Sequence, residues 1–459
     1  MPDVVSASSA SKRIWLVSAV TAVMLAGPTS PSEAQVVIPE RPIIWAPPWN
    51  ALHVFDPTLL PLLSDPTTRE PVAPEDTPVK GRQWPEYQPP GIRAGTWMFD
   101  PSVSAGGLYD SNVFSSNTEK QSDLAATLGA SLHARTLWER HGIDLRASTL
   151  STIYREHAGL NQTDASLNGQ AHFDIDHATT LLSGFQAAYL HAPVGSLISP
   201  AGAVEPTPFS LLSGDLTLRH EFGRLTGSAG ASVDSYDFGS TVAQNGRPIS
   251  KDSSDGQIYQ AHGRIDYAFS EKLSLFTAAS GNTRRLRGVP GLSFNSDGYR
   301  ALAGFDVELT PLVKAELAGG YMDQRFEAAS FGTLKGPTYR AMLTWSPSRQ
   351  LDVYFNAEQL VTTPGDISVT AIVANAAQLG FDYEIRRNVT LSAAATYEKD
   401  NFKTEVRNDT VYGVDVQLIY RLTNMSSISL RYNHIRRDSS QPQFDFDKDL
   451  IGIKATAQF

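Results

Sequence analysis

Apolar and polar residues alternate along most of the chain from residue 97 onward. Near the C-terminus every second residue is apolar and the residues between are polar or glycine; the apolar set is Phe459, Ala457, Ala455, Ile453 and Ile451. A period of two predicts a β-strand with one apolar and one polar face. Comparable runs recur at residues 123–138, 143–148, 164–175, 299–309 and 412–422. The pattern therefore predicts an all-β fold for this part of the chain.

The predicted strands are longer than those of soluble sheets, which have about five or six residues, and they match the roughly ten residues of a tilted strand that crosses a bilayer. About eighteen strands are expected, with sixteen as the alternative. They begin near residues 97, 122, 142, 162, 179, 209, 224, 257, 272, 298, 312, 337, 350, 371, 389, 408, 425 and 447. Short and long connections take turns between them. This order is typical of a transmembrane antiparallel up-and-down β-barrel with tight periplasmic turns and long outer loops.

An even strand number brings the last strand antiparallel to the first, and we expect it to pair with residues 99–108. That pairing closes the barrel, so that no strand edge faces lipid. A C-terminal strand that ends in phenylalanine also resembles the recognition signal of bacterial outer-membrane proteins. The residues predicted to close the barrel and to serve as its assembly signal are Phe459, Ala457, Ile453 and Ile451.

Aromatic residues are expected in two girdles, one at each membrane surface. Those near short turns are Trp138, Phe173, Phe222, Phe269, Trp345, Tyr383, Tyr420 and Phe459. Those near long loops are Tyr189, Tyr236, Tyr321 and Tyr397. The alternative is that they are ordinary hairpin aromatics with no common height.

Residues 1–34 have the pattern of a secretory signal peptide. Lys12 and Arg13 precede an apolar run at 14–26, and Ser32-Glu33-Ala34 offers a small-x-small cleavage site. The run is shorter than the about twenty residues of a membrane-spanning helix, and a short membrane anchor is the alternative. Export and a barrel together predict the outer membrane of a Gram-negative bacterium.

Residues 35–96 are dense in proline, which removes backbone donors and favours extended chain. They are predicted to form a periplasmic extension that precedes the barrel at 97–459. The extension also contains Trp45, Trp49, Phe55 and Trp84. Two readings stay open: a loosely ordered tether, or a segment that packs into the barrel lumen or docks a partner through its aromatic residues.

Charged residues occupy the strand faces opposite the apolar ones and are expected to line the lumen, because a charge on such a strand must sit in water or in a pair. The basic candidates are Arg135, Arg146, Arg219, Arg264, Arg300, Arg340, Arg421 and Arg431. The acidic candidates are Asp144, Asp164, Asp215, Asp266, Asp306, Glu316, Asp382 and Asp415. Because both signs are interleaved, they indicate a hydrated, salt-bridged wall; a selective constriction would need one sign at one height.

Composition narrows the function classes further. The chain has no cysteine, which excludes disulfides and thiolate metal sites, and its net charge of -10 gives no reason to expect nucleic-acid binding. The mean hydropathy of -0.21 is uninformative, since alternation hides apolar faces. No pattern assembles a nucleophile with a base, a metal cluster or a nucleotide-binding loop. We therefore expect no enzyme activity, no metal and no cofactor.

Residues 97–459 resemble the family of outer-membrane proteins described as putative beta-barrel porin type 2. The resemblance rests on Asp100-Pro101, on the run GLYDSNVF at 107–114 and on the closing strand. It implies a porin-like barrel in the outer membrane and brings neither a known substrate nor catalytic residues. Some relatives accompany exopolysaccharide export systems.

The predicted function is a channel for passive diffusion of small hydrophilic solutes or saccharides. The alternative is a plugged, non-conducting barrel that acts as a structural or docking element of an envelope or exopolysaccharide-export assembly. Expected partners are outer-membrane lipid, the barrel assembly machinery and a periplasmic or envelope partner of residues 35–96. The sequence leaves the oligomeric state open.

Overall fold

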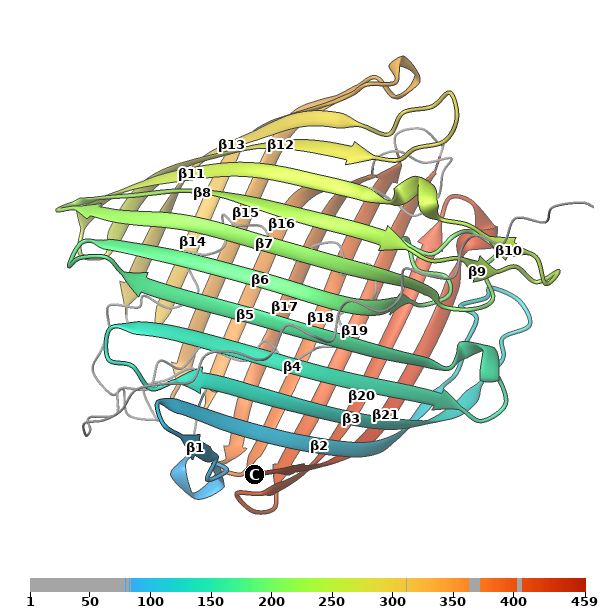
Figure 1. The fold of residues 1–459 in the computed structure, drawn as a ribbon, viewed down its shortest axis with the longest axis horizontal. Coiled ribbons are helices and arrows are strands. Elements are labelled where there is room, and N and C mark those ends of the chain that lie inside the picture. The colour runs from blue at the N-terminus through green and yellow to red at the C-terminus, as the bar shows by residue number, and fades with distance from the viewer. Residues whose placement is uncertain (1–78, 80–81, 83, 311, 363–371, 403–406) are drawn as a thin grey trace, which may run out of the picture. The chain divides into compact units, whose positions relative to one another are not determined.

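Eighteen long antiparallel strands close into a β-barrel (Figure 1). The structure is a computed structural model that describes residues 79, 82, 84–310, 312–362, 372–402 and 407–459. The expected signal peptide and most of the proline-rich extension lie outside the described residues, so both stay predictions. The barrel strands are β2 to β8 and β11 to β21, and a nineteenth strand of the same sheet, β1, pairs only with β2.

The strand bounds follow the predicted strand starts closely. The barrel strands are β2 (Trp97–Asp110), β3 (Asp123–Thr136), β4 (His141–Tyr154), β5 (Gln162–Asp174), β6 (Thr179–Ala192), β7 (Thr207–Phe222), β8 (Leu225–Phe238), β11 (Gly256–Ser270), β12 (Leu273–Leu286), β13 (Ser296–Thr310), β14 (Val313–Phe326), β15 (Thr333–Ser348), β16 (Leu351–Thr362), β17 (Ile372–Arg386), β18 (Val389–Phe402), β19 (Asn408–Arg421), β20 (Ser426–Ser439) and β21 (Phe446–Gln458). The prediction of eighteen strands is confirmed, and the alternative of sixteen is wrong.

Three short strands lie outside the barrel wall. They are β1 (Ile92–Ala94), β9 (Thr241–Val242) and β10 (Pro248–Ile249). The β9–β10 hairpin belongs to the loop between β8 and β11, while β1 forms a hairpin with the start of β2, at the opposite end of the barrel (Figure 1). Single 3-10 turns complete the structure; they are Pro85–Tyr87, Ala158–Leu160, Asp252–Ser254, Ala329–Phe331 and Pro442–Phe444. The sequence pattern had indicated none of these elements.

The last strand closes the barrel against the first, as predicted. β21 pairs antiparallel with β2 from Ser102↔Gln458 to Asp110↔Leu450. The backbone N–H of Phe459 continues this ladder by donating to Pro101 O at 3.0 Å. The C-terminus therefore lies beside β2 (Figure 1).

Connection lengths divide the barrel into two different ends. At the short-turn end neighbouring strands are joined by a few residues, as between Phe222 and Leu225, which pair directly across a two-residue turn. Gly223 in this turn has φ +70°, a conformation that glycine adopts without strain. At the loop end the connections are longer, and the segment between β6 and β7 covers residues 193–206.

The outer face of the barrel is apolar, and most of the predicted girdle aromatics lie on it. Exposed aromatics near the short turns are Trp138, Phe222, Phe269, Trp345, Tyr383, Tyr420 and Phe459, and those near the loops include Tyr189, Tyr321 and Tyr397. The placement of Tyr236 in a girdle is wrong, since its side chain is only 7% exposed and packs in an interior cluster with Phe209 and Phe238. The reason is that successive side chains of a strand point to opposite faces. Tyr236 lies an odd number of residues, three, after the exposed Val233 and therefore points to the interior face.

Candidate functional site

A network of buried ion pairs lies on the interior side of the wall, on the strands that follow the loop between β8 and β11. The guanidinium of Arg264 lies 2.7 Å from Asp266, 2.5 Å from Asp306 and 2.9 Å from Glu316. Arg340 joins it through a 2.8 Å contact between its Nε and Glu316 Oε1. The side chains of Arg264, Glu316 and Arg340 are at most 4% exposed.

Strand pairing explains why these charges meet. Arg264 and Asp266 are two residues apart on β11 and share its inner face, and Asp306 on β13 is the register partner of Glu316 on β14. β12 lies between β11 and β13 and contributes Phe276, whose ring centroid is 3.7 Å from the Arg264 guanidinium. Removing one member of a buried pair typically costs about 3–5 kcal/mol, because the partner charge is left uncompensated. The network therefore fixes this part of the wall.

Smaller ion pairs line other parts of the interior side. Arg135 lies 2.9 Å from Asp100, Arg146 lies 3.1 Å from Asp144 and Arg431 lies 2.7 Å from Asp415. On β16, β17 and β18 the same side carries a group of six carboxylates; they are Asp352, Glu358, Asp382, Glu384, Glu398 and Asp400. The interior is thus charged throughout, with one distinctly acidic stretch.

The described residues ahead of the barrel bind this acidic stretch at the short-turn end. The backbone N–H of Val79 donates to Asp352 Oδ2 at 2.6 Å. Glu384 Oε2 accepts from Arg82 Nη1 at 3.1 Å and from the indole Nε1 of Trp84 at 3.0 Å. Val79 and Arg82 are 4% and 9% exposed. We call the group Val79, Arg82, Trp84, Asp352 and Glu384 the short-turn anchor.

The outer edge of this anchor is more exposed. The Arg387 guanidinium lies 4.2 Å from the centroid of the Trp84 ring and 3.2 Å from Glu86. Trp84 was one of the aromatics that left the role of the extension open. Its contacts support packing against the barrel interior for the part of the extension that the structure describes.

At the loop end, residues 193–206 reach from β6 and β7 to strands on the other side of the barrel. Leu197 packs against Ile372 on β17 and Phe402 on β18. The Arg437 guanidinium on β20 donates to Gly195 O at 2.9 Å. These strands lie on the far side in Figure 1, behind β6 and β7. We call residues 193–206 the crossing loop.

The crossing loop is built to hold this position. Ile198 is 2% exposed and belongs to the same interior cluster as Phe209 and Tyr236. Its carbonyl accepts a hydrogen bond from Lys251 Nζ, and Lys251 is itself buried with its ammonium over the Phe238 ring. Apolar packing and a buried cation therefore fix the loop from both sides.

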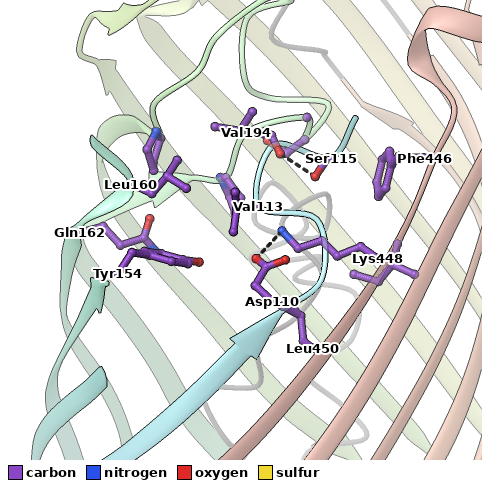
Figure 2. A pocket seen from close by; sticks show the side chains of 15 residues that line it. Asp110, Val113, Ser115, Tyr154, Leu160, Gln162, Val194, Phe446, Lys448 and Leu450 are labelled. Carbon is purple, nitrogen blue, oxygen red and sulfur yellow. Dashed lines mark hydrogen bonds and ion pairs between the residues drawn. The ribbon is translucent and has the colours of Figure 1, made fainter. Parts of the chain in front are cut away.

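A cavity of about 80 Å³ lies under the crossing loop, between the loop end of β2, β4 and the last two strands. Figure 2 shows Asp110 and Lys448 pointing at each other across it, with Tyr154 and Gln162 on another wall. The carboxylate of Asp110 lies 2.8 Å from Lys448 Nζ, and both side chains are largely buried. The rest of the lining is mostly apolar, including Phe446. A cavity of this size holds a few water molecules.

The structure brings together nine of the sixteen residues predicted to line the lumen. Five form the Arg264 network, and two further pairs are Arg146 with Asp144 and Arg431 with Asp415. The other seven contact residues outside the predicted set. Arg135 contacts Asp100, Arg219 Glu221, Arg300 Tyr339 O, Arg421 Thr390, Asp164 His191 and Asp382 Ser392, and Asp215 lies near Asp234. That these sixteen residues line a lumen stays a prediction.

Sequence reasoning missed several interior residues. Glu384 follows the predicted Asp382 by two residues and therefore shares its face, so alternation alone could have identified it. Lys448 could have been found in the same way from Gly452 and Lys454 on the closing strand. No local signal points to the path of the crossing loop, because its partners on the opposite wall are more than 170 residues away along the chain.

Comparison with known protein families establishes the fold and the class of this protein. The family model described as putative beta-barrel porin 2 matches residues 84–459. The chain belongs to this family. The resemblance inferred from residues 97–459 is therefore confirmed, and the porin-like barrel resides in the outer membrane. Porins as a class are channels rather than enzymes.

Solved structures with a similar architecture include proteins of two bacteria. OpdK of Pseudomonas aeruginosa, solved with vanillate, is 13% identical with a TM-score of 0.41, and the match covers 79% of this chain and 99% of that one. OccAB4 of Acinetobacter baumannii is 13% identical with a TM-score of 0.44, covering 79% and 98%. OccK2 of P. aeruginosa, solved with glucuronate, is 12% identical with a TM-score of 0.43, covering 79% and 98%. No curated protein matches the sequence.

The residues that the structure describes lack two features. They contain no helix long and apolar enough to cross a membrane. They also contain no group of three or more histidine, cysteine, aspartate or glutamate side chains arranged to hold a metal ion.

Proposed function

We propose that the protein is a channel for passive diffusion of small hydrophilic solutes, including saccharides, across the outer membrane. The observation that carries the proposal is the charged interior of a closed barrel whose outer face is apolar. Charged side chains such as Arg431 and Asp415 remain partly exposed on the interior side, at 20% and 30%. A wall of this kind offers water and polar solutes hydrogen-bonding partners along the whole path.

The crossing loop sets the width of this path. It spans the loop end of the barrel and is anchored on opposite sides by Leu197 and Ile198. A solute that enters from the loop end therefore passes beside the loop before it reaches the ion-paired wall. Because wall and loop are held by buried contacts, the mechanism needs no energy source and no large conformational change.

Planar-bilayer recording of the purified full-length protein tests the proposal. Addition of protein should give discrete conductance steps of uniform size. Heat-modifiable migration on a denaturing gel, measured on the same sample, establishes that the barrel is folded. A folded sample that gives no steps would contradict the proposal.

The short-turn anchor favours a second candidate function, a plugged barrel that serves as a docking element of an envelope assembly. Val79 and Arg82 are held by buried carboxylates, which would keep the extension inside the periplasmic mouth. In this case the full-length protein is silent, and steps emerge only when residues 36–95 are removed. Steps of the same size with and without these residues would exclude the plug.

A further inference from the structure

The closing seam between β2 and β21 differs from every other seam of the barrel. Each other pair of neighbouring barrel strands is consecutive in the chain and is joined by a connection, whereas β2 and β21 are joined only through their backbone ladder. Strand pairing without a covalent connection carries the full entropic cost of bringing the two ends together. Some other interaction must hold the two ends of this seam.

A short motif at the end of the first barrel strand, which begins with Asp110, supplies such interactions at the loop end. Asp110 pairs with Lys448 at 2.8 Å. Ser111 contributes its backbone N–H to Asp449 O at 3.0 Å and accepts the N–H of Asp449 on its Oγ at 2.8 Å. Three consecutive strand-end contacts therefore run from the motif to β21.

Asn112 completes the set and shapes the motif itself. Its Nδ2 donates to Asp447 O on β21 at 2.9 Å and to Ser116 O at 2.8 Å. Its Oδ1 accepts the N–H of Ser116 at 2.9 Å, and its own N–H donates to Asp110 Oδ1 at 2.9 Å. Asn112 is fully buried and Asp110 is 1% exposed. Both N–H groups and the oxygen of the Asn112 side-chain amide are thus used, one across the seam and two with Ser116.

The same motif also seats the crossing loop. Ser115 Oγ donates to Val194 O at 3.1 Å, as the dashed line in Figure 2 shows. Val113 packs with Val194 and Leu160 in one buried cluster. The residues that fasten the seam are therefore continuous with those that support the loop across the mouth.

We infer that residues 110–115 form a clasp that locks the first strand to the last and seats the crossing loop. The clasp takes the place of the covalent connection that this seam lacks. The GLYDSNVF run, which carried the family resemblance, thereby acquires a physical role: the aspartate, serine and asparagine bind β21, and the residues after them bind the loop.

Substitution of the clasp tests the inference through the temperature at which the folded band disappears from a denaturing gel. Asn112→Ala should lower this temperature by roughly 5–10 °C, because buried hydrogen-bonding groups on both strands lose their partner. Lys448→Met should lower it by a comparable amount, because it leaves the buried Asp110 carboxylate without its cationic partner while the Asn112 contacts remain. Asp123→Asn is the matched control: Asp123 is the register partner of Asp110 and equally buried, but its seam to β4 already has a covalent turn.

A disulfide across the seam distinguishes a clasp from a residue needed only for local folding. Ser104 and Thr456 are register partners at a non-hydrogen-bonded position, where Cα atoms lie about 4.5 Å apart and a disulfide fits. The chain has no other cysteine to interfere. Ser104→Cys with Thr456→Cys should restore the gel temperature of Asn112→Ala when oxidised and lose the rescue when reduced.

Two outcomes would overturn the inference. One is an Asn112→Ala protein with the same gel temperature as the unaltered chain or as the Asp123→Asn control. The other is an oxidised seam disulfide, verified by mass spectrometry, that leaves the Asn112→Ala defect in place. If Asn112→Ala alone does not assemble, the disulfide variant and Lys448→Met still give both readouts. Neither readout depends on whether the barrel conducts.

Discussion

Different kinds of contact hold the segments that lie at the two mouths of the barrel. At the loop end, the crossing loop is one of the connections between wall strands. Its partly buried Leu197 and its buried Ile198 pack in apolar clusters with strands from both sides. At the short-turn end the turns are too short to cover anything. There the described contacts come from the short-turn anchor, which consists of hydrogen bonds and one ion pair to Asp352 and Glu384.

This difference indicates which of the two sets of contacts can be released while the barrel stays folded. Apolar burial of several side chains is additive and insensitive to pH, so the crossing loop should stay in place while the barrel is folded. Two carboxylates that hold a peptide segment can be neutralised singly, and their loss leaves the barrel wall intact. We therefore expect the loop end to act as a fixed constriction and the short-turn end to be where access to the proposed channel changes.

Shortening the crossing loop should have the largest effect on conductance. Removal of residues 195–203 takes away the segment that reaches Ile372 and Arg437, and we expect a rise of roughly twofold or more in the single-channel step. The matched control removes 244–246, an exposed hairpin tip at the same end, and should leave the step unchanged. Equal steps in both deletions would show that the loop does not narrow the path.

Release of the short-turn anchor should have the next largest effect. Asp352→Asn combined with Glu384→Gln neutralises both carboxylates that hold the segment and so weakens its charge-assisted hydrogen bonds, and we expect longer or more frequent open events with an unaltered step size. Glu308→Gln is the control, because Glu308 forms an exposed pair with Lys314 at the same end of the barrel. An unaltered opening frequency in the double variant would assign no access role to this anchor.

Two glycines of the crossing loop should differ in their tolerance of alanine. Both have φ near +80°, so each substitution costs about 1 kcal/mol in backbone strain. A Cβ at Gly195 would also meet the Ser115 Cβ at 2.5 Å, whereas a Cβ at Gly202 meets nothing within 4 Å. Gly195→Ala should therefore lower the free energy of unfolding by about 2–3 kcal/mol and Gly202→Ala by about 1 kcal/mol.

Denaturant titration of the two variants measures this difference. The comparison is internal, since both residues belong to one loop and share one backbone conformation. Equal losses would mean that the loop can shift away from Ser115 at no cost, and its position would then not be fixed.

The smallest effect on channel opening is expected from a change of pH, which acts on Glu86 at the outer edge of the short-turn anchor. A hydrogen bond from its own backbone N–H and the neighbouring Arg387 lower the pKa of Glu86 below its ordinary value. A lowered pKa means that the contact stabilises the docked segment at neutral pH and is lost as the pH falls through that pKa. Opening frequency should therefore rise slightly on acidification, and Glu86→Gln should abolish this part of the response. A response of the same size in Glu86→Gln would assign it to other groups.

The wall of the barrel could be predicted from the sequence, and the contents of its mouths could not. Strand starts, the short-turn and loop ends, and the pairing of the closing strand all follow from a period of two, which is a local property. Even Tyr236 could have been placed on the interior side by its parity with Val233. The same alternation predicts that charges such as Arg264 and Glu316 face the interior. Their mutual contacts could be predicted only with knowledge of the register between the strands.

The crossing loop and the short-turn anchor depend on contacts between residues far apart in the chain. Leu197 has no periodic neighbours that reveal its packing against Phe402, and Val79 is 273 residues from the Asp352 that it binds. Such contacts become visible only when the closed barrel brings opposite walls together. The clasp is an intermediate case: its motif stands out in the sequence, but its partners on β21 do not.

Swelling of liposomes that contain the purified protein tests the central claim most directly, because it follows uncharged solutes through the path itself. Vesicles are mixed with a series of sugars of increasing size, and the initial swelling rate is recorded by light scattering. We predict rapid swelling with the smallest sugar and a rate that falls steadily with size. The absence of swelling with the smallest sugar, in vesicles whose barrel is shown to be folded, would contradict the account.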